Sequence, residues 1–356
     1  MKTRLPIFAL LVFAAAAVGW TAANRGRNAD HVGEGPSDDR AAVTLTTSAN
    51  ATATDAPIEA KGETPSGDAV PSGDVVIPDS DALLRRAVSQ LNATGGIEAK
   101  VRQRVDLFDR ELIGSGSYVQ QGSGVTTRLR LEMRMRTDKA ATELLQVCNG
   151  ETLWTFNAAD GLRTLRRVDV DRVIDALRSD ASTRPGGFSG VAMGLGGLPW
   201  MVDGLRQYCR FAPAESGRLG DLDVLIVNGT WRSEKLLALL PDDEKKRVAE
   251  GGKIDPARLP PHLPDGVVIY LGRDDLFPYR FDYTRTLPRD ASQSAPAAGG
   301  VAVPAKSKTI VTLEFYEVQI GAAIPPDRFA YKPGQGAIDD TERYIERLKA
   351  SQLSKP

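Results

Sequence analysis

Histidine and cysteine are scarce in this chain of 356 residues, which contains two of each. His31 falls in a segment without aromatic residues, and His262 falls in a proline-rich loop. A Ser-His-Asp triad or a histidine-based zinc site therefore has too few residues to draw on. Cys148 and Cys209 are also too far apart in sequence for a Cys-x-x-Cys pair. We expect no catalytic residue, no metal and no cofactor.

The sequence also lacks phosphate-binding motifs and a large net charge. A net charge of -1 provides no field that would attract nucleic acid, so we expect no nucleic-acid partner. The glycines from Gly194 onwards fail the dinucleotide fingerprint, because Pro199 occupies its sixth position. Carboxylates are plentiful, but none stands out, and an envelope hydrolase is the weakest alternative.

The N-terminus has the form of an export signal. Residues 1–4 include two basic side chains, and residues 5–20 form an almost unbroken apolar run. Small residues follow, and they suit cleavage after Ala23. The run is shorter than the roughly 20 residues that span a membrane as a helix. Residues 1–23 are therefore predicted to be a signal peptide, with an uncleaved N-terminal anchor through residues 5–20 as the alternative. Either reading places the protein in the periplasm or cell envelope.

A spacer follows. Residues 24–79 contain no aromatic residue and carry ten acidic and four basic side chains. Such a segment cannot bury enough apolar surface to offset its ordering entropy, so we predict a disordered acidic spacer.

Export would bring the two cysteines into an oxidising compartment. Two alternatives are then open for Cys148 and Cys209: one disulfide, or two separate buried thiols.

The remaining domain, residues 80–350, is rich in strand patterns. In residues 125–136 apolar and charged side chains alternate, which is typical of a strand with one buried face. Asn149-Gly150 between two such runs predicts a tight hairpin. The connections are too short for alternating strands and helices. We predict a mainly β, α+β fold in which a strongly curved antiparallel sheet or half-open β-barrel of about ten strands is covered by a few helices.

The expected strands cover residues 97–107, 113–120, 125–136, 142–148, 151–156, 162–168, 206–214, 221–232, 267–271, 279–287 and 310–320. The expected helices begin near residues 80, 169, 200, 233 and 339, and residues 288–308 are predicted to be an irregular insert.

The stretch from Gly186 to Trp200 alternates glycine with apolar side chains. A loose backbone with apolar side chains suits a flap over an apolar cavity, and its side chains would be Phe188, Met193, Leu195 and Trp200. The alternatives are permanent core and contact with a membrane.

Two motifs resemble the LolA/LolB/LppX family of periplasmic lipoprotein carriers. The Asn-Gly turn followed by Leu153-Trp154-Thr155-Phe156 is similar to one family signature, and Phe329 to Gly336 resembles its terminal Phe-x-x-x-Pro-x-Gly element. The resemblance implies a half-open barrel whose concave face holds acyl chains. The Arg-Pro that carriers use to gate ligand release has no counterpart near Arg128.

This resemblance leads to a functional prediction. We expect a non-enzymatic envelope protein that binds lipid or lipoprotein acyl chains in an apolar concave cavity. The predicted lining consists of Leu129, Leu131, Met133, Met135, Trp154 and Phe156. Core packing is the alternative for each of these positions, and a sensor or scaffold that binds a protein partner is the alternative function.

Overall fold

The computed structural model describes residues 79–107, 110–136, 141–159, 161–179, 190–240, 242–255, 259–260, 263–287 and 306–352. The predicted export signal, the spacer up to residue 78, the insert from residue 288 to residue 305, His31 and His262 lie outside the described residues.

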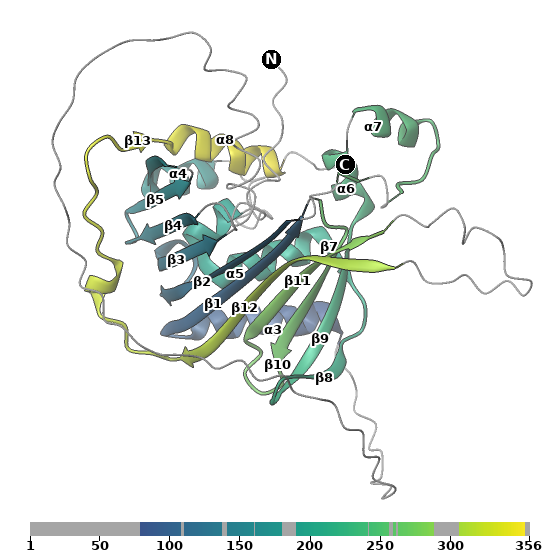
Figure 1. Cartoon of the computed structure of the whole chain (residues 1–356), viewed down its shortest axis with the longest axis horizontal. Coiled ribbons are helices and arrows are strands. Elements are labelled where there is room, and N and C mark those ends of the chain that lie inside the picture. Colours follow the sequence, from purple (N-terminus) through teal and green to yellow (C-terminus); the bar gives the residue numbers. More distant parts are fainter. Residues whose placement is uncertain are drawn as a thin grey trace, which may run out of the picture. The chain divides into compact units, whose positions relative to one another are not determined.

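One curved sheet dominates the described domain (Figure 1). It has 13 strands in the order β13-β6-β5-β4-β3-β2-β1-β12-β11-β10-β9-β7, and β8 pairs with β9. Neighbouring strands are antiparallel, except that β13 runs parallel to β6. The order starts at β13 and ends at β7, so the sheet is curved but not closed. The predicted fold class, a mainly β half-open barrel, is confirmed.

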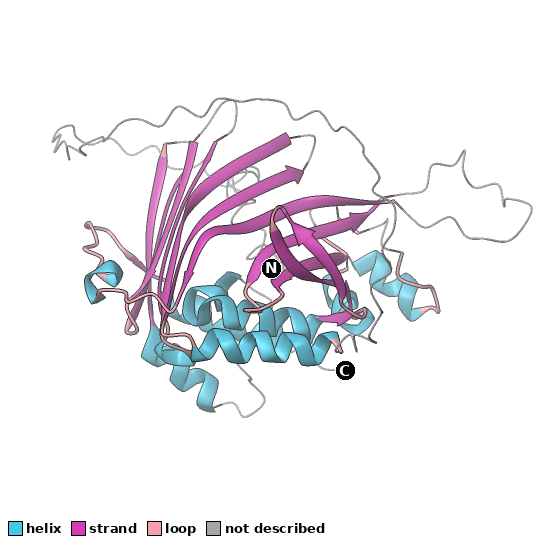
Figure 2. Ribbon diagram, turned by 90° about the horizontal axis from the view of Figure 1, so that it is seen from below, coloured by secondary structure: helices cyan, strands magenta, loops and turns pink. Residues whose placement is uncertain are grey.

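The strands are β1 (Gly96–Leu107), β2 (Arg110–Gln121), β3 (Arg128–Arg136), β4 (Ala141–Cys148), β5 (Thr152–Ala159), β6 (Leu162–Asp169), β7 (Cys209–Phe211), β8 (Glu215–Leu219), β9 (Leu222–Trp231), β10 (Gly266–Gly272), β11 (Pro278–Thr286), β12 (Ser307–Ile320) and β13 (Ile338–Asp339). The helices are α3 (Ser80–Ala93), α4 (Val170–Ser179), α5 (Gly190–Tyr208), α6 (Ser233–Leu239), α7 (Asp242–Ala249) and α8 (Thr341–Gln352). Figure 2 shows most of the helices gathered toward one end of the long strands.

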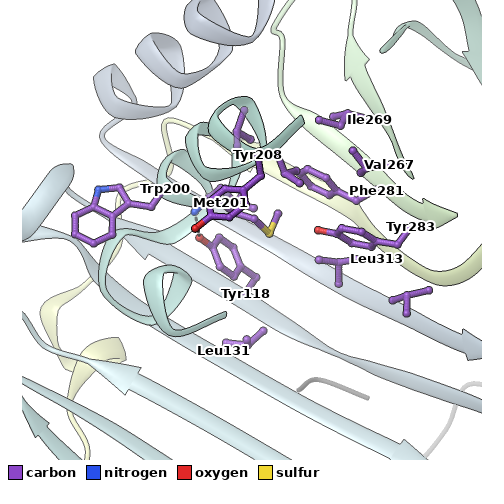
Figure 3. Packing of buried hydrophobic residues seen from close by; sticks show 14 of the residues in the cluster. Tyr118, Leu131, Trp200, Met201, Tyr208, Val267, Ile269, Phe281, Tyr283 and Leu313 are labelled. Atoms are coloured by element: carbon purple, nitrogen blue, oxygen red, sulfur yellow. Dashed lines mark hydrogen bonds between the residues drawn. The ribbon is translucent and has the colours of Figure 1, made fainter. Parts of the chain in front are cut away.

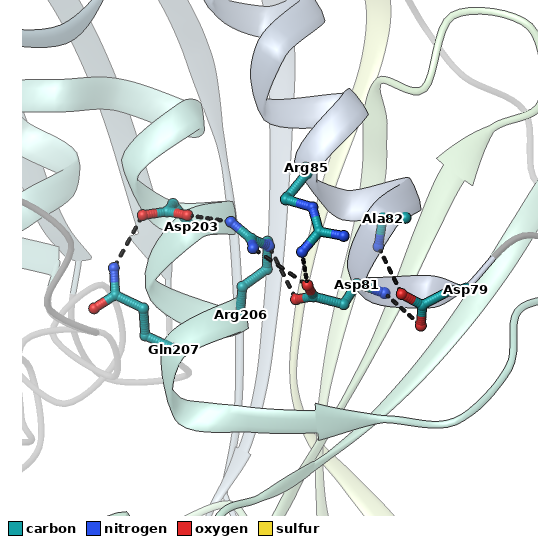
Figure 4. Close-up of polar contacts among 7 residues, drawn as sticks. All are labelled: Asp79, Asp81, Ala82, Arg85, Asp203, Arg206 and Gln207. Atoms are coloured by element: carbon teal, nitrogen blue, oxygen red, sulfur yellow. Dashed lines mark hydrogen bonds and ion pairs between the residues drawn. The ribbon is translucent and has the colours of Figure 1, made fainter.

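The N-terminus of helix α3 is capped and is joined to α5 by ion pairs. The Asp79 carboxylate accepts hydrogen bonds from the backbone N–H groups of Asp81 and Ala82, which would otherwise lack a partner in the first turn. Asp81 in turn pairs with Arg206 of α5, with 3.2 Å between Oδ1 and Nε. Arg206 also pairs with Asp203 in its own helix, at 2.6 Å (Figure 4). These contacts join the two helices side by side.

The core lies between the sheet and these helices. Tyr118, Leu131, Phe281 and Leu313 project from four different strands toward Met201 of α5, and all five are buried (Figure 3). Tyr118 also packs edge-on against Phe315. Burial of aromatic and aliphatic area on this scale supplies most of the folding free energy of such a domain.

Two predicted elements were wrong. The single helix expected from residue 233 onwards is two helices, α6 and α7, because Leu240 precedes a proline and adopts an extended conformation with ψ of 152°. The strand expected over residues 206–214 is short, since α5 continues to Tyr208 and only Cys209–Phe211 is strand. Strand β8 was not predicted from the sequence, and within it Gly217 leaves room for the side chain of Ile226.

Sequence patterns did not reveal the segment after β12. A 3-10 helix (Pro326–Phe329) and the irregular residues around it cross the outer face of the sheet on the way to β13. Ile324 and Phe329 pack there against Val119 of β2 and are buried. We call residues 322–337 the strap.

The two motifs behind the family resemblance meet at the strap. The ring of Trp154, from the hairpin motif, lies 5.8 Å from the ring of Tyr331, from the terminal motif. Arg328 of the strap also pairs with Glu98 of β1, at 2.9 Å. Both motifs therefore have a structural role in holding the strap on the sheet.

Candidate functional site

The face of the sheet that meets α5 is the candidate site, and we call it the inner face. Leu129, Leu131, Met133 and Met135 of β3 all point to this face and are at most 4% exposed. On β1 the same face carries Val101 and other apolar side chains, because residues directly opposite one another in the ladder share a face. The structure thus brings four of the six predicted lining residues together.

Glycines on the neighbouring strand β2 make room for the methionines. A side chain at Gly114 would lie 2.6 Å from Cγ of Met135 and 3.3 Å from Cε of Met133. The two thioether chains therefore lie over a strip of bare backbone. Methionine is flexible and polarisable, which lets these two side chains fill the space above the glycine.

Trp154 and Phe156, the other two predicted lining residues, do not lie on this face. Leu153 pairs with Cys148 and Thr155 pairs with Gln146, which puts these two positions of β5 on the inner face. Successive side chains of a strand point in opposite directions, so Trp154 and Phe156 lie on the outer face. The predicted hairpin is present, and the structure places these two side chains on the side of the sheet opposite to the predicted lining.

The glycine-rich stretch is helical from residue 190 and broken at Gly197, where φ is 62° and ψ is -153°. Pro199 follows and starts the second half of α5, as the sequence indicated. A Cβ at Gly197 would lie 2.1 Å from Oε1 of Gln120, so the chain can pass this point only as glycine.

A buried polar contact holds this break against the sheet. The backbone N–H of Leu198 lies 3.1 Å from both the hydroxyl of Tyr118 and Oε1 of Gln120. The Tyr118 hydroxyl in turn donates to Gln120. Burial raises the pKa of Tyr118 far above its ordinary value, so the hydroxyl keeps its proton as a donor.

The structure describes the side chains of two of the four predicted flap residues, and both are buried. Leu195 and Trp200 are 3% and 8% exposed and belong to the core, and the Trp200 ring lies over the bare backbone of Gly196. Phe188 lies outside the described residues, and the side chain of Met193 is not among those described. From residue 194 onwards, the stretch is packed core.

The inner face changes character across β4, β5 and β6. Leu131 is followed along its row by Gln146, Thr155 and Arg166, and the next row continues from Met133 to Leu144, Asn157 and Thr164. This polar band was missed from the sequence. A signal was present, because the adjacent Arg166 and Arg167 must point to opposite faces of a strand.

Arg166 joins a cluster of charges at the start of α8. Its Nη1 lies 3.2 Å from the carboxylate of Asp340, whose side chain is 9% exposed. Arg347 and Arg343 approach the same carboxylate at 3.6 Å and 3.9 Å. Burial and the neighbouring arginines lower the pKa of Arg347, while Asp340 acts in the opposite direction.

Two amide oxygens on the inner face are fully buried, and neither has a hydrogen-bond partner among the described residues. One belongs to Gln103, which lies between Gly114 and Leu313 in its row and is 2% exposed. The other belongs to Gln146 in the polar band. An unpaired buried acceptor costs free energy, so each points to a donor from water or a ligand.

Cys148 and Cys209 are free thiols, and both are buried. Of the two alternatives from the sequence, the structure has separate thiols. Burial raises the pKa of Cys148, and it raises the pKa of Cys209 to about 12. Neither thiol is a reactive thiolate at neutral pH.

No protein-family model and no curated protein matches the chain. Solved structures do resemble it. A LolA superfamily protein from Nitrosomonas europaea is 10% identical with a TM-score of 0.25, covering 71% of this chain and 98% of its own. A putative outer membrane lipoprotein-sorting protein domain from Vibrio parahaemolyticus is 7% identical with a TM-score of 0.28, covering 70% and 95%.

A third structure is the Pseudomonas aeruginosa MucA/MucB complex, which is 11% identical with a TM-score of 0.35, covering 71% of this chain and 61% of its own. The resemblance seen in the sequence thus recurs among solved structures. All three TM-scores are below 0.5, so the fold assignment rests on the strand order of this chain itself.

Two further properties concern only the described part of the chain. None of its helices combines the length and apolar character that a membrane span requires. It also holds no group of three histidine, cysteine or acidic side chains arranged to bind a metal ion.

Proposed function

We propose that this protein binds the acyl chains of lipids or lipoproteins on its inner face, in the cell envelope, without catalysing a reaction. The observation that carries the proposal is the inner face itself. On β1, β2, β3 and β12 it presents buried apolar side chains in a sheet that curves without closing. Each methylene removed from water contributes about 0.8 kcal/mol, so binding needs no catalytic group.

The methionines support this proposal. Met133 and Met135 lie over Gly114 and can change rotamer to make room for a chain, whereas β-branched residues would be stiffer. The unpaired oxygen of Gln103 in the same part of the face favours a second molecule there. Cell-envelope localisation, the signal peptide and the domain limits rest on the sequence, and an envelope protein partner stays a prediction.

Native mass spectrometry of the protein purified from the envelope tests the proposal. We expect lipid adducts that disappear on organic extraction. In a binding assay with a fluorescent fatty acid, Met133→Gln should weaken affinity about tenfold, because it places an amide against the acyl chain.

Glu132→Gln is the matched control, since it lies next to Met133 on the exposed face of the same strand. It should leave the affinity unchanged. A clean apo mass together with no binding of the fluorescent fatty acid would refute the proposal.

A further inference from the structure

Positive charge exceeds negative charge where the polar band meets α8. Asp340 is the one carboxylate among the described residues that pairs with Arg166 or Arg347, and Arg343 shares it. Asp339 pairs with Arg167 and Glu342 pairs with Arg172, while Glu346 is exposed on α8 and makes no ion pair among the described residues. At the Asp340 contact itself, three guanidinium groups meet one carboxylate, so positive charge is in excess there.

Two of the three arginine side chains that carry this positive charge are only partly exposed to solvent. The side chains of Arg166 and Arg347 are 24% and 29% exposed, against 64% for Arg343. A guanidinium has five N–H donors, and the described residues accept one hydrogen bond from Arg166 and none from Arg347. Most of the donors of these two arginines are therefore available to an anion, which would also relieve their mutual repulsion.

The cluster borders the apolar part of the inner face. Arg166 stands in the same row as Thr155, Gln146 and Leu131, so the row runs from a guanidinium to an aliphatic side chain within four adjacent strands. The unpaired oxygen of Gln146 lies between these two ends and needs a hydrogen-bond donor. An apolar wall beside a cationic, hydrogen-bonding wall suits an amphiphile with an anionic headgroup.

We propose that Arg166, Arg347 and Gln146 form a headgroup subsite for a phosphate-bearing lipid whose chains lie along the apolar part of the inner face. The inference rests on the proposed function and adds the ligand class to it. The two arginines bind the phosphate, and a P–OH, hydroxyl or ammonium group of the headgroup donates to the Gln146 oxygen. Arginine suits the phosphate role because its planar fork matches the phosphate oxygens.

The test compares two lipids that share their acyl chains, phosphatidic acid and diacylglycerol, each labelled with a fluorophore on one chain. The full chain should bind phosphatidic acid about tenfold more tightly, as expected for charge-assisted hydrogen bonds. Arg166→Gln should remove this preference and leave diacylglycerol binding unchanged. Arg166→Lys should restore part of it, because it keeps the charge without the fork.

Arg167→Gln is the control, because Arg167 is the next residue of β6, points to the outer face and pairs with Asp339. It should change neither affinity. If Arg166→Gln fails to fold, Arg347→Gln replaces it, with the same expected loss of preference. Glycerol phosphate at millimolar concentration should not displace the lipid.

The outcomes separate the two proposals. Equal binding of both lipids by the wild-type protein would overturn the headgroup subsite and leave acyl-chain binding intact. Displacement by glycerol phosphate would assign the cluster to a free phosphate and also overturn the subsite. Failure to bind either lipid would refute the proposed function itself.

Discussion

Single residues decide how α5 meets the sheet. Gly197 brings the helix backbone so close to Gln120 that the N–H of Leu198 reaches the buried side-chain oxygens there. Pro199 has no N–H of its own and begins the next helical turn. Glycine and proline together thus turn an apolar stretch into two short helical segments with a fixed break.

Gly197→Ala should destabilise the protein by about 2 kcal/mol or more. Alanine would have to adopt the positive φ, and its Cβ would clash with the Gln120 amide. Urea unfolding followed by circular dichroism measures the effect. Gly95→Ala is the control, because Gly95 has open space around it and no positive φ. Equal stability of the two variants would show that the break is not a fixed feature.

Burial of Cys209 predicts a dependence of stability on pH. The thiol ionises near pH 9 in the unfolded chain but only near pH 12 in the folded protein. The unfolded state therefore loses its proton first, and the free energy of unfolding falls as pH rises from 9 toward 12, by up to about 1.4 kcal/mol per pH unit for this one group.

Below pH 9 this contribution is fully present and constant. Cys209→Ala should therefore lose less stability between pH 9 and pH 11 than the wild-type protein, as measured by urea titrations at each pH. An identical alkaline decline in both proteins would contradict the assigned pKa.

At the scale of elements, local patterns predicted strands better than faces. The alternation in residues 125–136 predicted β3 and its buried side, but the strand begins only at Arg128, after a 3-10 helix over Gly124–Thr126. The hairpin around Asn149-Gly150 was also found, because its turn residues are diagnostic. The local pattern did not show which side of the sheet Trp154 covers, because its ring contacts Tyr331 of the strap, about 175 residues away in sequence.

The strap should act as one stabilising element. Phe329→Ala removes a side chain that is 2% exposed and should cost about 3–5 kcal/mol. Hydrogen exchange should then speed up across residues 322–337, because Tyr331 and Ile324 lose their anchor. Lys332→Ala changes an exposed side chain of the same segment and should cost less than about 0.5 kcal/mol. If hydrogen exchange across residues 322–337 were the same in both variants as in the wild-type protein, Phe329 would not be what holds the strap on the sheet.

At the scale of the whole molecule, the fold class followed from the sequence, but the polar band did not. Short connections and alternating patterns are enough to predict a curved antiparallel sheet. Arg166 and Asp340 are separated by most of the domain, and only the pairing of β13 with β6 brings them together. Their contact is a property of the tertiary fold.

The inner face therefore combines an apolar part, which continues from Leu129 along Cys148, Leu153 and Val168, with a polar band that ends at Arg166. This division is what distinguishes a surface for amphiphiles from a uniform hydrophobic core.

Photo-crosslinking with a diazirine fatty acid tests the central claim most directly. After irradiation and proteolysis, mass spectrometry assigns adducts to single residues of β3. Acyl-chain binding on the inner face predicts adducts at Leu131 and Met133 and none at Arg130 and Arg134, which point to the outer face of the same strand. Adducts confined to the outer face, or none within the domain, would contradict the claim.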